Sequence, residues 1–195
     1  SKKSYDLSRL VSYNKLQFFS KNILLIGISN WISEKIEGSN VFSNNKVKTI
    51  FNCIESDSFY PIGKDKARDV LGIKTNKKII LTGAQDSNHK YKGFDKFLSA
   101  VKHFHKDEVL LLFFGNLKSS DIENLGFEYI NFGFLKDLVS LRLLYSSADV
   151  FVAPSILEAF GKTLVESMSC KTPVVCFNIG GPKDIVDHKI NGYKS

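Results

Sequence analysis

The sequence contains few of the residues that cross-link a chain or stiffen its turns, with three cysteines and four prolines among 195 residues. Cys53, Cys170 and Cys176 are odd in number and show no CxxC or CxxH spacing, and no secretory signal is visible. Together these features indicate reduced thiols in a cytosolic protein. His103 and His105 lie two apart in a helix-like stretch and so point to different sides, and no metal site is predicted.

Long hydrophobic runs are also missing. The longest, "ILLIGI" (23–28) and "VLLLFF" (109–114), are far shorter than the roughly 20 residues that a membrane-spanning helix needs. The chain is 43% hydrophobic and 24% charged, which is typical of a soluble globular protein. It begins at Ser1 rather than at methionine, so we expect a fragment or a trimmed chain.

Arginine is scarce although the chain is basic. The net charge is +7, from 27 lysines and arginines against 20 acidic residues, but only Arg9, Arg68 and Arg142 are arginine. Proteins that read bases favour the arginine fork, so nucleic acid is not predicted as a partner. A basic surface facing anionic lipid, or general solubility, fits the charge at least as well.

Short apolar runs alternate with amphipathic patterns along most of the chain. Most of the runs are continuous rather than alternating, as expected for strands covered on both faces. The predicted strands are 23–28, 47–51, 78–82, 109–114, 128–132, 149–153 and 173–177.

Helical patterns lie between these strands. One apolar stripe is formed by Phe94, Phe97, Leu98, Val101 and Phe104, and another by Leu138, Leu141, Leu144 and Tyr145, with Asp137 as its N-cap. Ile32 and Ile36 mark a short helix, with Ser29 or Asn30 before it and Gly38 behind it. Alternating strands and helices predict an α/β fold, a Rossmann-like parallel sheet with helices on both faces.

The polar segment "ESDSFYPIGKDKARDVLGI" (55–73) separates two apolar strands and is the candidate linker. We therefore place a domain boundary near residue 62, which gives domains 1–62 and 63–195. In parallel sheets ligands bind beyond the carboxyl ends of the strands. Gly83, Gly115 and Gly133 all lie at such ends, where the backbone must turn tightly or approach a ligand.

The stretch "EAFGKTLVE" (158–166) follows one of these strands and carries two carboxylates. If both were on one helix, Glu158 and Glu166 would be about 12 Å apart along its axis. Carboxylate pairs that cleave glycosides lie roughly 5–9.5 Å apart, so a hydrolase pair is disfavoured.

A ligand clamp fits the stretch better. The free N–H groups of Gly161, Lys162 and Thr163 at a helix start form a natural phosphate site. A carboxylate on each side can accept hydrogen bonds from hydroxyls, so the ligand would be a nucleotide sugar. The alternative is that Glu158 only complements the helix dipole and that Glu166 is solvated.

The stretch resembles the E-x7-E signature of retaining GT-B glycosyltransferases of the family 4 type. The resemblance extends through residues 144–193, and upstream to "LTGAQDSNHKYKGFDKFLSAV" and "VKTIFNCIESDSFYP". It covers roughly residues 22 to 195. It implies that 63–195 form the nucleotide-sugar donor domain, that 1–62 are the tail of an acceptor domain, and that the closing helices of the family lie beyond "NGYKS".

The resemblance also implies site residues. Glu158 would contact the donor sugar close to the anomeric carbon, and Lys92 would neutralise the diphosphate, so these two are the catalytic candidates. Glu166 would hold the ribose hydroxyls, and Phe134 and Leu135 would border the nucleobase. The implied donor-binding set is Gly83, Ala84, Lys92, Phe134, Leu135, Glu158, Ala159, Phe160, Gly161, Lys162, Thr163, Leu164 and Glu166.

Four places depart from the family pattern, and in one of them "NCIE" (52–55) replaces the usual Asn-Gly-[Ile/Val]-Asp. Ala84 replaces a frequent arginine, Lys162 stands where an apolar residue is commoner, and Lys171 replaces a usual helix-ending glycine. Lys90, Lys92 or Lys162 could supply the charge missing at Ala84. His89 and Lys90 compete with Lys92 for its role.

The resemblance implies retaining, metal-independent sugar transfer to a glycan or lipid-linked acceptor, in bacterial surface-polysaccharide synthesis. No cofactor is expected, because the nucleotide diphosphate sugar is the donor substrate. A lipid-linked acceptor would bring the cytoplasmic enzyme to the inner face of the membrane, and the fragment alone would be inactive or nearly so. Two alternatives stay open: another GT-B enzyme, such as a nucleotide-sugar epimerase or a phosphorylase, and a non-enzymatic nucleotide-binding module.

Overall fold

The chain divides into two compact units, Ser1–Asn52 and Cys53–Ser195, in a computed structural model. The structure describes residues 7, 10, 11, 13, 14, 23–86, 90–117 and 119–195. Most of the first 22 residues, and His89, therefore lie outside the described residues.

The smaller unit contains one strand–helix–strand motif. Strands β1 (Leu24–Gly27) and β2 (Lys46–Thr49) pair in parallel, and helix α2 (Asn30–Glu37) connects them. The predicted caps of α2 are confirmed, since Ser29 accepts a hydrogen bond from the Ile32 amide at 3.1 Å and Gly38 closes the helix. Ser33 on α2 and Thr49 on β2 share a hydrogen bond of 2.7 Å.

The larger unit contains a six-stranded sheet in the order β5-β4-β3-β6-β7-β8, and every pair in it is parallel. The chain builds the sheet outward from β3 to β5 and then returns to place β6 on the other side of β3. The strands are β3 (Lys78–Asp86), β4 (Val109–Asn116), β5 (Tyr129–Asn131), β6 (Val150–Ala153), β7 (Val174–Cys176) and β8 (Gly192–Lys194).

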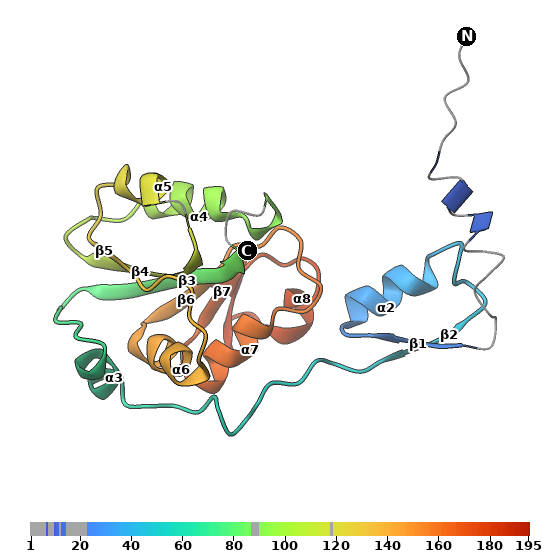
Figure 1. Cartoon of the computed structure of the whole chain (residues 1–195), viewed down its shortest axis with the longest axis horizontal. Helices are drawn as coiled ribbons and strands as arrows, with labels where there is room; N and C mark the ends of the chain where they lie inside the picture. The colour runs from blue at the N-terminus through green and yellow to red at the C-terminus, as the bar shows by residue number, and fades with distance from the viewer. Residues whose placement is uncertain (1–6, 8–9, 12, 15–22, 87–89, 118) are drawn as a thin grey trace, which may run out of the picture. The chain divides into compact units, whose positions relative to one another are not determined.

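Both faces of this sheet are covered by helices (Figure 1). Alternate residues of β3 point to opposite faces: Leu81 packs with Leu144 and Leu164, whereas Ile80 packs with Phe97 and other residues on the opposite side. The predicted α/β class with a parallel sheet is therefore confirmed. The helices are α3 (Lys64–Val70), the 3-10 helix η1 (Lys90–Lys92), α4 (Phe94–Val101), α5 (Ser119–Glu123), α6 (Leu138–Ser147), α7 (Lys162–Ser169) and α8 (Pro182–Ile185).

The helices agree with the sequence predictions at the N-cap of α6 and differ from them at the end of α4 and at α3. Asp137 is the N-cap of α6 as predicted and accepts from the Ser140 amide at 2.7 Å, and this hydrogen bond lowers the pKa of Asp137. Helix α4 ends at Val101, so Phe104 lies beyond it and is 51% exposed rather than part of the buried stripe. The predicted linker 55–73 contains helix α3, whose Ala67 is fully buried.

The division between the units falls ten residues before the predicted boundary near residue 62. The physical reason is Phe59, which is only 5% exposed and lies in the core of the larger unit, where its ring packs against Tyr145. Ile54 also packs against this core. Residues 53–62 therefore fold with the larger unit, while the origin of 1–62 in an acceptor domain stays a prediction.

Helix α3 is attached to the sheet by ion pairs at the amino end of β6. Asp149 accepts hydrogen bonds from Lys64 Nζ at 2.6 Å, Arg68 Nη2 at 2.9 Å and the Ile79 amide at 2.8 Å. Arg68 Nε also donates to the Ser147 carbonyl at 3.0 Å. Burial by itself would raise the pKa of Asp149, but the hydrogen bonds from Lys64 and Ile79 and the charges of Lys64 and Arg68 lower it overall.

Replacing Asp149 by asparagine is expected to destabilise the larger unit by roughly 1.5 kcal/mol at neutral pH, because it weakens charge-assisted hydrogen bonds. A lowered folded-state pKa means that this stabilisation is complete above the ordinary value of 3.8 and is lost as the pH falls below it. Urea unfolding of both proteins from neutral to acid pH should show the difference shrinking at the acid end. The exposed Asp69→Asn variant is the control, and equal losses in both variants would contradict the prediction.

Candidate functional site

The candidate site lies where the carboxyl ends of β3 and β6 meet. These two strands are neighbours in the sheet although their paired residues lie 70 positions apart in the sequence, as in the pairing of Leu81 with Phe151. Strand β3 leads towards η1, and β6 leads into a loop that ends at α7. The Ile156 amide donates to the Tyr91 carbonyl at 2.9 Å, so the two connections are hydrogen bonded to each other.

Lys92 and Glu158 form an ion pair across this junction. Lys92 Nζ donates to Glu158 Oε2 at 2.6 Å, with the Lys92 side chain 34% exposed and the Glu158 side chain 24% exposed. Both groups are therefore accessible at the surface and still partly desolvated, which strengthens their attraction. The structure brings the two predicted catalytic candidates together. It also shows that Glu158 has a specific partner rather than serving only the helix dipole.

Glycines behind the pair allow the loops to pack this closely. Gly93 has a φ of +64°, and a Cβ there would collide with the carbonyl oxygen of Pro154. Gly181 donates its amide to the Glu158 carbonyl at 2.8 Å, and a Cβ on Gly180 would strike that same carbonyl oxygen. The backbone that carries Glu158 is thus supported by the "NIGGP" loop.

Helix α7 begins one residue after Gly161, as predicted. Gly161 is buried, has a φ of +106° and is the N-cap, so no side chain caps the first amides of the helix. Lys162 is exposed and Thr163 half-buried, while Leu164 is fully buried and anchors the helix in the core. An uncapped helix start with Lys162 as its first residue is a favourable place for a phosphate group.

Glu166 lies in the second turn of α7 and is not a solvated surface charge. Its Oε2 accepts a hydrogen bond from the Tyr145 hydroxyl at 3.0 Å. Burial raises the pKa of Glu166, while the Tyr145 hydrogen bond and the charge of Lys162 oppose that rise. The sequence predicts Tyr145 only as a member of an apolar stripe, and its hydrogen bond to Glu166 is not part of that prediction.

The remaining predicted residues border the same end of the sheet. Gly83 lies within β3, with Phe114 so close that a Cβ would be 2.5 Å from its carbonyl oxygen, and Ala84 follows it. Phe134 is 46% exposed just after β5, whereas Leu135 packs against the core. Ala159 is half-buried and Phe160 only 5% exposed, so the Phe160 ring belongs to the interior rather than to a ligand surface.

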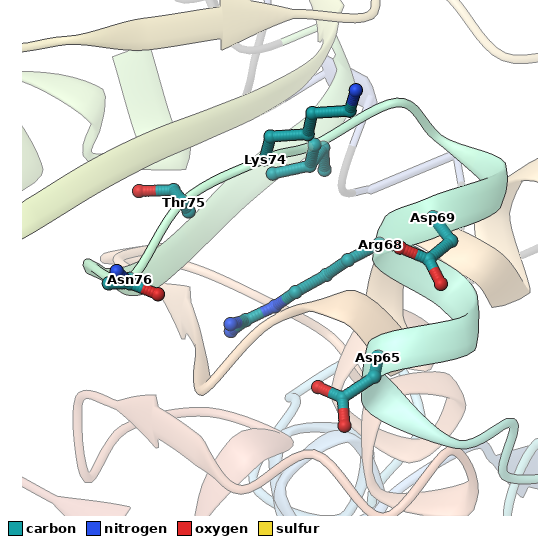
Figure 2. A pocket seen from close by; sticks show the side chains of 7 residues that line it. Asp65, Arg68, Asp69, Lys74, Thr75 and Asn76 are labelled. Carbon is teal, nitrogen blue, oxygen red and sulfur yellow. The ribbon is translucent and has the colours of Figure 1, made fainter.

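A hollow of about 540 Å³ lies elsewhere, between α3 and the segment before β3 (Figure 2). It is at the amino ends of the strands, opposite to the candidate site, and its Arg68 is already bonded to Asp149 and to the Ser147 carbonyl. The hollow is lined by Asp65, Arg68, Asp69, Ile73, Lys74, Thr75 and Asn76. It contains none of the predicted donor-binding residues.

Among the described residues, no group of three or more His, Cys, Asp or Glu side chains is placed to share a metal ion. The three cysteines are free thiols, with Cys53 exposed and Cys170 and Cys176 buried. The helices in the described part of the chain are all too short or too polar to cross a membrane. The absence of a metal requirement stays a prediction.

Comparison with known proteins gives one family. Residues 63–194 match the family described as glycosyl transferases group 1. An uncharacterised glycosyltransferase of Methanocaldococcus jannaschii is 27% identical over 206 residues, which is 98% of this chain and 50% of the relative. The chain therefore spans about half the length of that relative.

Solved structures show the same fold. Sucrose-phosphate synthase from Thermosynechococcus elongatus superimposes with a TM-score of 0.78 and 26% identity, covering 100% of this chain and 50% of that protein. HepE from Anabaena, in complex with UDP-glucose, gives a TM-score of 0.75 with 22% identity, covering 100% of this chain and 55% of that protein. Both similarities include the parallel sheet whose carboxyl edge carries the Lys92–Glu158 pair.

Proposed function

The chain belongs to the glycosyl transferases group 1 family, and from this premise we propose that residues 63–195 bind a nucleotide diphosphate sugar as the donor in sugar transfer. The observation that supports the proposal is an uncapped helix start that follows Glu158, which is paired with Lys92, and that is followed in the second turn of α7 by Glu166. Sugar and ribose hydroxyls would occupy the two carboxylates, and the diphosphate would lie between them.

These residues would promote sugar transfer by stabilising charge. When the sugar leaves the donor, negative charge develops on the nucleoside diphosphate, and Lys92 and the amides at the start of α7 would stabilise that charge. Glu158 would orient the sugar through its hydroxyls. The nucleophile would be a hydroxyl of the acceptor, and we assign no general base to these residues. Transfer with retention of the anomeric configuration is part of the proposal.

The sugar-nucleotide class is supported by the relatives. HepE was solved with UDP-glucose bound, and the uncharacterised relative is named as a glycosyltransferase. For the acceptor we propose a glycan or a lipid-linked glycan in bacterial surface-polysaccharide synthesis. The net charge of +7 would favour contact of the cytoplasmic enzyme with the anionic inner face of the membrane.

Thermal unfolding with a panel of UDP, GDP and ADP tests the proposal, because a ligand that binds only the native state raises its stability. One nucleotide is expected to raise the melting temperature of the 195-residue chain. The Glu166→Ala variant, which loses the acceptor for the ribose hydroxyls, should need roughly ten times more of that nucleotide for the same rise.

The matched control is Glu108→Ala, which removes an exposed carboxylate at the amino end of β4, far along the strand from the site. It should respond to the nucleotide as the unaltered chain does. No stabilisation by any of the three nucleotides at millimolar concentration would refute donor binding.

A further inference from the structure

Tyr145 is fixed in the core of the larger unit by its ring and by its backbone. It is fully buried in the core of the larger unit, and its ring packs against Phe59, Phe114 and Phe151 at centroid distances of 6.2, 5.9 and 5.3 Å. Its backbone carbonyl accepts a hydrogen bond of 2.7 Å from the Thr172 hydroxyl, which ties α6 to the end of α7. The position of the Tyr145 hydroxyl is therefore fixed.

The hydroxyl of such a tyrosine needs a partner, because an unpaired polar group in a core is costly. Glu166 Oε2 is that partner at 3.0 Å, and Glu166 is itself only half-buried. A carboxylate has two oxygens, each able to accept more than one hydrogen bond. Among the described residues, only the Tyr145 side chain donates a hydrogen bond to the Glu166 carboxylate. The other acceptor positions of Glu166 are therefore available for a ligand.

We infer that Tyr145 is a positioning residue for the donor, which holds one oxygen of Glu166 so that the carboxylate is oriented in advance towards the ribose hydroxyls. The inference rests on the proposed function and adds to it a residue that does not touch the ligand. A carboxylate held in advance loses less freedom on binding, so its hydrogen bonds contribute more to affinity.

A pH profile separates this role from a merely structural one. The groups that interact with Glu166 are Tyr145 on α6, Lys162 on α7 and Cys170 at the C-cap of α7. Burial raises the pKa of Cys170 to about 11 and places the pKa of Tyr145 well above its ordinary value, so both stay neutral in mild acid. Burial raises the pKa of Glu166, and protonation turns one of its two oxygens from an acceptor into a donor, which removes an acceptor for the ribose hydroxyls.

The hydrogen bond from Tyr145 determines the direction in which the pKa of Glu166 changes when the hydroxyl is removed. Donation from Tyr145 favours the ionised form of Glu166 and so lowers its pKa against the effect of burial. Without the hydroxyl, the pKa of Glu166 rises. Affinity for the nucleotide should then be lost at a higher pH than in the unaltered chain.

The experiment measures the dissociation constant of UDP, GDP or ADP, whichever stabilises the unaltered chain, between about pH 5 and pH 8. Tyr145→Phe is expected to weaken binding roughly five- to tenfold at neutral pH and to move the midpoint of the pH profile upward. The 2′,3′-dideoxy form of the same nucleotide lacks the hydroxyls that Glu166 would hold, so the variant should bind it as well as the unaltered chain does. Tyr129→Phe, whose ring packs with Phe113 on the other face of the sheet, is the control and should change neither quantity.

An unchanged affinity and midpoint in Tyr145→Phe would overturn the inference while leaving donor binding intact. An equal loss at every pH, or an equal loss for the dideoxy nucleotide, would also overturn it, because either result describes general damage to the core. If the unaltered chain binds none of the nucleotides, the proposed function fails first. Should Tyr145→Phe not fold, 4-aminophenylalanine at this position keeps a weaker para donor, and it should give a smaller upward shift of the midpoint; no shift would overturn the inference.

Discussion

Replacing Lys92 by methionine is expected to weaken nucleoside diphosphate binding roughly a hundredfold, or by about 2.7 kcal/mol. Two effects add. The diphosphate loses a cation, and Glu158, which pairs with Lys92 at 2.6 Å, becomes an uncompensated negative charge beside it. Isothermal titration with the nucleotide that stabilises the unaltered chain measures the loss.

Lys90→Met is the matched control, because it removes the same charge from the same short helix at an exposed position. A loss of less than about threefold is expected there, as for other exposed charges. The double variant Lys92→Met, Glu158→Gln should recover part of the affinity, since it removes the repulsion between Glu158 and phosphate. A larger loss in Lys90→Met than in Lys92→Met would transfer the phosphate role to Lys90.

Replacing Gly93 by alanine is expected to lower the free energy of unfolding of the larger unit by about 3 kcal/mol or more. Gly93 combines a φ of +64° with contact to the Pro154 carbonyl, so the added methyl group meets both backbone strain and a collision with another backbone segment. Relief of the collision would separate the β3 and β6 connections and pull Lys92 away from Glu158. Urea unfolding should show the loss, and nucleotide affinity should fall with it.

The Gly72→Ala variant measures the backbone strain without the collision. Gly72 has nearly the same φ, +69°, but nothing lies within 4 Å of the position of its added Cβ. It should cost only about 1 kcal/mol, the strain of the left-handed conformation alone. Equal losses at Gly72 and Gly93 would show that the contact with Pro154 is unimportant.

The main strands could be predicted because the sheet is covered on both faces. A run such as "VLLLFF" has no polar alternation, and β4 is accordingly buried along nearly its whole length. Strand β8 was missed because it is a three-residue edge strand with Tyr193 half exposed, and only its pairing with β7 defines it. Helix α3 was missed for a similar reason, since Ala67 is its one buried residue and ion pairs to Asp149 attach it to the sheet.

The candidate site was predictable as a set of residues but not as a set of contacts. The motif around Glu158 and Glu166 and the position of Lys92 after a strand could be identified in the sequence. That Lys92 pairs with Glu158, and Tyr145 with Glu166, depends on segments 66 and 21 residues apart, which only the fold brings together. One signal was present: a tyrosine within a leucine stripe has a hydroxyl that must find a partner in the core.

The order of the strands has a consequence for the folding of the molecule. Lys92 follows β3 and Glu158 follows β6, and these strands become neighbours only after the chain has completed β4 and β5 on the other side. A nascent chain that stops before residue 150 can therefore carry the lysine but not the pair. Affinity for the nucleotide would arise late in synthesis and in one step, and so would report that the central sheet is complete.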